Sequence, residues 1–190
     1  MEKISFPAIY QQIKEVVANP AQFWVKTKSE NKSNADLLAG YYLPLVLVAS
    51  LAVFLGTWIG SSHFYIGFAI LKAIRELVIL ILQYFISVFF VNELITTFDG
   101  EKNIVAAKKL VAYSLSPLLL VSIVTGLFPA LYIVDILGLY SIYIFWVGAK
   151  ELLNLPERKL SSYILISCLL SLFVLGFLSI LLWKIFMMLY

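Results

Sequence analysis

The carboxylate of Glu93 lies inside a long apolar run of the sequence, next to Asn92. If that run crosses a bilayer, an ionisable side chain at its centre costs on the order of 2.5–3.5 kcal/mol, and such residues usually face the inside of a helix bundle next to a partner. Two cations, Lys108 and Lys109, lie at the entrance to the next apolar run and could pair with this carboxylate. We therefore predict an ion pair between Glu93 and one of these lysines that fixes the register of two helices.

A second carboxylate, Asp135, interrupts another apolar run, and Lys72 or Arg75 is the cation available to it on its side of the membrane. We predict an ion pair here as well. Because Asp135 and Glu93 would lie near opposite faces of the membrane, they do not predict a single proton relay. For both carboxylates, the alternative to a structural ion pair is a place in a transport path.

Polar residues also gather in the stretch 111–120, VAYSLSPLLL, where Tyr113, Ser114, Ser116 and Pro117 lie among aliphatic residues. A turn here would leave two segments too short to cross a bilayer, so the stretch is predicted to lie inside one helix. Pro117 removes a backbone hydrogen bond, which bends the helix and frees the carbonyl of Tyr113. The serine hydroxyls can bond the freed backbone or a neighbouring helix. We interpret the bend as a packing feature, with a substrate site as the alternative.

Two tyrosines, Tyr140 and Tyr143, are three residues apart and so share one face of a predicted helix. Their hydroxyls need hydrogen-bond partners wherever the rings are buried. We predict a packing role, and the alternative is that they line a groove for a lipid or a substrate.

The residues Gly56 and Gly60 form a GxxxG pattern inside the first apolar run. Such small residues allow close contact between helices. Because the pattern is common by chance in apolar segments, it predicts a close contact but not a dimer.

Catalytic patterns find little support in the sequence. His63 is the only histidine and Cys168 the only cysteine, so a histidine cluster for zinc or a disulfide within the chain is excluded. The three aspartates, Asp36, Asp99 and Asp135, do not place two carboxylates in facing spans. No HExxH, GxSxG or phosphate-binding loop is present. We predict that the chain is not an enzyme and uses no cofactor or metal.

The composition places these residues in a membrane protein. The chain is 62% hydrophobic and 13% charged, with a mean hydropathy of +0.97, far from the roughly 45–50% apolar and 25% charged residues of soluble domains. Apolar runs reach the length of about 20 residues that crosses a bilayer. We predict an all-α, polytopic bundle of five transmembrane helices, spanning about 41–60, 76–97, 109–126, 131–149 and 162–183. The second span is read as one long tilted helix, although residues 64–73 could form a separate interfacial segment.

Positive charges predict the orientation of the bundle, since Lys and Arg near span ends are retained in the cytoplasm. With a cytoplasmic N-terminus, eleven of the fourteen Lys and Arg residues lie inside, and only Lys72, Arg75 and Lys184 lie outside. The same placement accounts for the net charge of +3, so a nucleic-acid partner is not predicted.

The first 38 residues are predicted to form a cytoplasmic segment, followed by a transmembrane domain at 39–190. Apolar residues recur at helical spacing until Asn19-Pro20 ends the pattern, which indicates a short amphipathic helix; they are Phe6, Ile9, Ile13, Val16 and Val17. This helix lies either on the inner leaflet or against the cytoplasmic ends of the bundle, and the sequence leaves both open.

Several of these motifs together resemble bacterial Yip1-domain proteins, in the order and spacing that the family shows over nearly the whole chain. The residues that carry the resemblance are Asn19-Pro20, Trp24, Tyr42-Leu43-Pro44-Leu45, FDGEKN (98–103), Ala107, VAYSLSP (111–117), Pro129, LGLYSIYIFWVG (137–148), Pro156 and Lys159. The charged loop 149–159 departs from the simpler loop of such relatives. The resemblance implies a five-helix integral membrane domain with a cytoplasmic N-terminus in a bacterial inner membrane.

Two classes of function are consistent with these sequence features. The first is a non-catalytic scaffold or accessory protein that binds a membrane-protein partner, a role that the resemblance suggests through relatives associated with exporters or envelope-stress systems. The second is a small transporter, channel or lipid-moving protein that uses the bent helix and the carboxylates. Eukaryotic members of the family resemble trafficking factors that engage small GTPases, but no such contact motif can be carried over. Membrane lipids are expected partners in either case, and a homo-oligomer is left open.

We expect a reporter fused after Tyr190 to lie outside the cytoplasm, because the charge bias puts the N-terminus inside and five spans reverse the side. Paired fusions to a periplasm-active phosphatase and a cytoplasm-active fluorescent protein measure this directly. A fluorescent, phosphatase-inactive C-terminal fusion would contradict the predicted topology.

Overall fold

The computed structural model describes residues 6–29, 37–60 and 65–189, and within these residues the chain is helical with no strand. Five helical segments are long and apolar enough to cross a membrane. Their bounds are Leu38–Ile59, Ile66–Thr97, Ile104–Leu127, Pro129–Leu152 and Glu157–Met188. The predicted all-α bundle of five spans is thereby confirmed.

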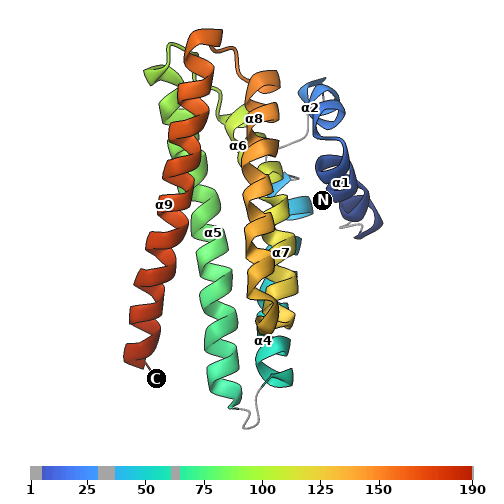
Figure 1. The fold of residues 1–190 in the computed structure, drawn as a ribbon, viewed down its shortest axis with the longest axis vertical. Helices are drawn as coiled ribbons and strands as arrows, with labels where there is room; N and C mark the ends of the chain where they lie inside the picture. The colour runs from blue at the N-terminus through green and yellow to red at the C-terminus, as the bar shows by residue number, and fades with distance from the viewer. Residues whose placement is uncertain (1–5, 30–36, 61–64, 190) are drawn as a thin grey trace.

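The elements follow one another along the chain as Figure 1 shows. They are α1 (Phe6–Ala18), α2 (Pro20–Ser29), the π-helix η1 (Leu38–Tyr42), α4 (Leu43–Ile59), α5 (Ile66–Thr97), α6 (Ile104–Ser114), α7 (Ser116–Leu127), the 3-10 helix η2 (Pro129–Leu139), α8 (Tyr140–Leu152) and α9 (Glu157–Leu189). Successive spans run in opposite directions, so the α5–α6 and α8–α9 connections lie at one end of the bundle, at the top of Figure 1. The C-terminus lies at the other end.

The second span is a single helix, as predicted, but it begins ten residues before the expected position 76. Its 32 residues correspond to a length of about 48 Å, well beyond the roughly 30 Å of a bilayer core. Arg75 and Glu76, expected at the entrance of the span, therefore lie well inside the helix. This shift moves a charged pair into the depth of the bundle.

The third span is divided at Leu115, between α6 and α7. Leu115 has φ −76° and ψ −4°, and Pro117 follows in the first turn of α7, where a missing N–H is tolerated. The fourth span differs from the single helix expected at 131–149. After Pro129 it runs as a 3-10 helix for 11 residues before α8 begins at Tyr140.

The N-terminal segment packs against the transmembrane bundle. Helix α2 packs on α8, and α1 contacts α2 and α7. Ile9 and Val16 of α1 are buried, on the apolar face that the spacing predicted. Trp24 of α2 is fully buried, and its indole Nε1 donates to the carbonyl of Ile144 at 3.1 Å.

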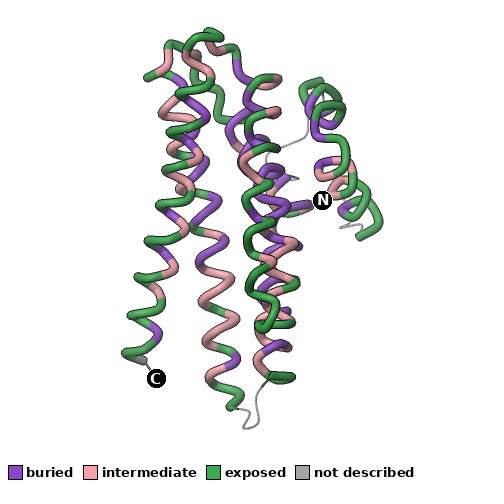
Figure 2. Tube along the Cα trace, in the orientation of Figure 1, coloured by how far each residue is buried: buried purple, intermediate pink, exposed green. Residues whose placement is uncertain are grey.

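Burial divides the bundle into an interior and a lipid-facing side. Figure 2 shows buried residues concentrated along α5 and where α2, α6 and α8 meet, whereas most of η2 and much of α9 are exposed. Tyr132 and Ile133 of η2 are more than 70% exposed, as expected for side chains that face lipid. The fourth and fifth spans thus lie at the periphery.

The closest helix contact is between α4 and α7. A Cβ atom added to Gly56 would lie 1.8 Å from the carbonyl oxygen of Gly126. An added Cβ on Gly60 would meet only the carbonyl of Gly56, in its own span. Of the GxxxG pair, Gly56 therefore makes a close contact inside one chain, and Gly60 does not.

Substitution Gly56→Ala should destabilise the protein by about 1–3 kcal/mol or prevent folding, because the backbones of α4 and α7 must separate to admit a methyl group. Unfolding in mixed detergent micelles measures the change. The control is Gly176→Ala, since an added Cβ at Gly176 meets nothing within 4 Å. Equal stability of the two variants would contradict the packing described here.

Candidate functional site

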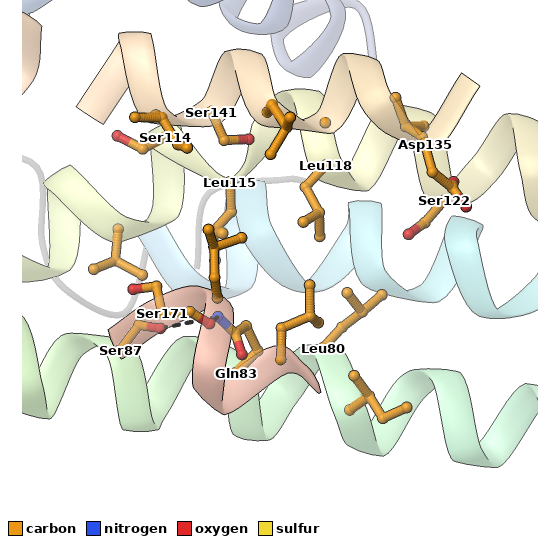
Figure 3. Close-up of a pocket in the computed structure, with 18 of the residues that line it drawn as sticks. Leu80, Gln83, Ser87, Ser114, Leu115, Leu118, Ser122, Asp135, Ser141 and Ser171 are labelled. Atoms are coloured by element: carbon orange, nitrogen blue, oxygen red, sulfur yellow. Dashed lines mark hydrogen bonds between the residues drawn. The ribbon is translucent and has the colours of Figure 1, made fainter. Parts of the chain in front are cut away.

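A cavity of about 340 Å³ lies inside the bundle, between α5, the α6–α7 bend, the η2–α8 span and α9. Its walls combine aliphatic and polar side chains (Figure 3). The residues along α5 that line it extend from Arg75 to Ser87, a length of about 18 Å along the helix axis. The cavity is therefore elongated and lies at the depth of the membrane.

One end of the cavity is charged. Glu76, Ser122 and Asp135 line this end, and the Glu76 side chain contacts the Ser122 hydroxyl. Figure 3 shows Asp135 and Ser122 reaching toward each other from η2 and α7. Glu76 was not among the predicted site residues, because its sequence position suggested the edge of a span.

The predicted ion pair of Asp135 with Lys72 or Arg75 is wrong within the described residues. Arg75 lines the same cavity but turns toward α9, where its Nη2 donates to the carbonyl of Ser179 at 3.0 Å and the guanidinium lies 5.6 Å from the Trp183 ring. Lys72 instead lies over the ring of Phe68, one helical turn away on α5, at 4.6 Å. Both cations therefore contact groups other than the Asp135 carboxylate.

The middle of the cavity holds Gln83, near the midpoint of α5 and only 2% exposed. Its Nε2 donates to the Ser87 hydroxyl at 3.2 Å and to the carbonyl of Ser171 at 2.9 Å (Figure 3). Its Oε1 is buried without a hydrogen-bond partner. The sequence signal for this residue is an amide in the middle of an apolar span. Gln83 was nevertheless not among the predicted site residues.

Two serine hydroxyls complete the polar lining. Ser114 of α6 and Ser141 of α8 are also buried without partners, and both line the cavity. Asp135 and Gly138 of η2 both line the cavity, because a 3-10 helix of three residues per turn places every third residue on one face. Ser141 lines it from the first turn of α8.

Val111 and Leu115 of the 111–117 motif also line the cavity, whereas Tyr113 and Ser116 do not and belong to a hydrogen-bonded chain. Ser116 donates to the carbonyl of Tyr113, the group freed by Pro117, at 2.7 Å. The hydroxyl of Tyr41 in η1 lies 2.6 Å from that of Ser116. The bend thus separates Ser114, on the cavity side, from Ser116, on the side of η1.

Aromatic rings surround the bend on that second side. The Tyr113 ring packs edge-on against Phe23 at 4.8 Å between centroids and against Trp24 at 5.9 Å, and it lies 4.8 Å from Tyr41. Gly148 leaves room for this arrangement, because an added Cβ there would lie 2.5 Å from the Trp24 ring. The motif therefore joins the N-terminal helices to the transmembrane bundle.

The predicted pairing of Glu93 with Lys108 or Lys109 is also wrong. Glu93 pairs with Lys102, whose Nζ lies 2.6 and 2.7 Å from its two carboxylate oxygens. The short α5–α6 connection turns back toward α5 and brings Lys102 closer than either lysine of α6. Lys109 is buried and donates to the carbonyl of Thr27 in α2 at 2.9 Å, while Lys108 is half-buried.

The two tyrosines of α8 share a face and stack, with 5.4 Å between ring centroids. The hydroxyl of Tyr140 donates to the carbonyl of Val17, near the end of α1, at 3.0 Å. Tyr143 is half exposed. These residues stand beside the N-terminal helices and do not line the cavity.

Within the described ranges, no three His, Cys, Asp or Glu side chains are placed to hold a metal ion. His63 lies outside those ranges. Cys168 lines the cavity. The candidate site is thus a cavity with a charged end and an uncharged, hydrogen-bonding middle. Aliphatic side chains connect the two.

Comparison with known protein families gives one match. The family model of the Yip1 domain matches residues 14–180, which includes all five spans in whole or in large part. No curated protein and no solved structure matches the chain.

Substitution Ser116→Ala should destabilise the protein by about 1–3 kcal/mol, because it leaves the buried Tyr41 hydroxyl and the Tyr113 carbonyl without a partner. The matched control is Ser114→Ala, two residues away, which removes a buried hydroxyl that has no partner and should change stability little. Unfolding in mixed micelles compares the two. A larger loss for Ser114→Ala would contradict the division of the motif described here.

Proposed function

The chain belongs to the Yip1 domain family and is a multi-pass membrane protein, and from this premise we propose that it is a non-catalytic scaffold or accessory protein that binds another membrane protein. The contact that we propose is the α5–α6 connection, residues 98–103, called the 98–103 loop below. The observation that supports it most is that this loop is largely exposed and yet joined to α5 and α9 by ion pairs.

Two ion pairs hold the 98–103 loop at both sides. Lys102 pairs with Glu93 of α5, and Asp99 pairs with Lys159 of α9. Exposed ion pairs contribute little stability singly, roughly 0–1 kcal/mol each, so their effect is to restrict the loop more than to stabilise the fold. A restricted loop binds a partner at a smaller cost in conformational entropy.

The backbone of the loop is also unusual. Asp99 has φ 61°, the one positive value recorded for a non-glycine residue in the described part of the chain. Gly100 follows, and an added Cβ there would lie 2.5 Å from Leu155 and 2.7 Å from Ile95. A backbone held in a rarely populated region at an exposed place supports a hypothesis of function.

Charge supports the side of the membrane on which this contact would occur. Six of the eleven positive residues that the orientation rule assigns to the cytoplasm lie in the 98–103 loop, in α2 or on either side of the α8–α9 connection; they are Lys102, Lys26, Lys28, Lys150, Arg158 and Lys159. We propose a bacterial cytoplasmic membrane as the location, with α1 and α2 inside and the C-terminus outside. Lipids and a second copy of the chain remain partners to be tested there.

The second candidate function, a transporter or lipid-moving protein, is favoured by a different observation. Gln83, Ser114 and Ser141 bring unpartnered polar atoms to a cavity at membrane depth, joined at one end by Glu76 and Asp135. Transporters commonly place substrate sites at such depth. Binding in this cavity and binding of a protein at the 98–103 loop can occur in one molecule.

Photocrosslinking in native membranes from a reactive residue placed at the exposed Glu101 tests the scaffold proposal. We expect capture of one membrane complex, identified by mass spectrometry, and a several-fold lower yield when Lys102→Ala and Lys159→Ala together release the loop. The control is Lys26→Ala, which removes another exposed ion pair, with Glu15, on the N-terminal helices. Capture of only lipid and the chain itself, or an unchanged yield from the released loop, would overturn the proposal.

A further inference from the structure

The cavity contains polar groups that the protein itself leaves unsatisfied. Gln83 Oε1 is an acceptor without a donor, and the Ser114 and Ser141 hydroxyls have neither a donor nor an acceptor nearby. Gln83 and Ser114 are 2% and 3% exposed. In a bilayer, where no solvent compensates, such groups are costly and generally mark the place of a hydrogen-bonding ligand or water.

The charged end of the cavity brings two carboxyl groups together. Glu76 and Asp135 line it, and the nearby Arg75 guanidinium donates to the Ser179 carbonyl of α9. With both carboxyl groups ionised, one of them would lack a balancing cation, which is costly at membrane depth. A ligand ammonium placed between the two groups would donate to both and stabilise their charged forms.

Aliphatic side chains connect the charged end with the hydrogen-bonding middle. Leu80 and Leu118 lie between Gln83 and Asp135 in Figure 3, and Leu115 lines the cavity with them. Glu76 and Gln83 are seven residues apart on α5, a separation of about 10.5 Å along the axis. The volume of about 340 Å³ falls in the range of sites that hold a small organic ligand.

We propose that this cavity binds a long-chain ammonium amphiphile. Its ammonium group lies between Glu76 and Asp135, its hydroxyl or ester groups meet Gln83, Ser114 and Ser141, and its hydrocarbon contacts the aliphatic lining of the cavity. Two sources can supply this chemistry, a free amine or the aminoethyl head of a phospholipid. The Nε of Arg75 is buried without a partner, which favours a phosphate group next to the ammonium.

The test is a binding titration of the full chain in phosphatidylglycerol nanodiscs. Lysophosphatidylethanolamine is the probe, and lysophosphatidylglycerol, which lacks the ammonium, is its matched control. We expect saturable binding of the first and much weaker binding of the second. Dodecylamine separates the sources: binding as tight as that of the lysolipid assigns the site to free amines, and weaker binding assigns it to the lipid head.

Variants locate the binding within the molecule. Glu76→Gln and Asp135→Asn should each raise the Kd for lysophosphatidylethanolamine roughly tenfold or more, since each removes a charge-assisted contact. The control is Glu93→Gln, the same substitution on the same helix but outside the cavity, which should leave the Kd unchanged. Asp135 is exposed, so its variant keeps the test valid if Glu76→Gln fails to fold.

Three results would overturn the proposal. The first is equal binding of the two lysolipids, the second is an unchanged Kd in a folded Glu76→Gln or Asp135→Asn variant, and the third is the absence of saturable binding to the wild-type chain.

Discussion

The carbonyl that Pro117 leaves without its helical donor is the constraint on which the arrangement of this bundle depends. In lipid, an unsatisfied backbone group costs several kcal/mol, so the bend in the third span needs a local donor. Ser116 supplies it, and the Tyr41 hydroxyl extends the chain of hydrogen bonds to η1. Through the Tyr113 ring the same bend contacts Phe23 and Trp24, so the first span and the N-terminal helices are oriented by one proline.

Small residues make this arrangement sterically feasible. Gly56 and Gly126 let α4 and α7 approach until their backbones touch, and Gly148 lets the indole of Trp24 lie flat against α8. Because lipid gives no hydrophobic force between helices, close packing of this kind carries much of the association. On the opposite side of the bend the packing is incomplete, and that is where the cavity lies.

The sequence predicted the spans, the amphipathic N-terminal helix and the family resemblance, because each depends on patterns extending over many residues. The predicted ion-pair partners were wrong, because a shift of one helical turn changes which side chains meet. Glu93 pairs with Lys102 because a short loop reverses on itself, and Arg75 faces α9 because of the helical phase of α5. Glu76 and Gln83 were visible as polar residues, but only the packing of α5 against three other spans shows that they face a common space. The 3-10 winding of the fourth span has no clear sequence signal, since its residues are typical of any apolar helix.

That winding determines which way a charge faces. A 3-10 helix turns about 120° per residue, whereas an α-helix turns about 100°. Over the four residues from Asp135 to the end of η2 at Leu139, the two windings differ by about 80°, enough to turn Asp135 from the cavity toward the surrounding lipid. The hydrogen-bond register of one peripheral backbone segment therefore controls the electrostatic potential inside the bundle, although none of the interior side chains changes its place.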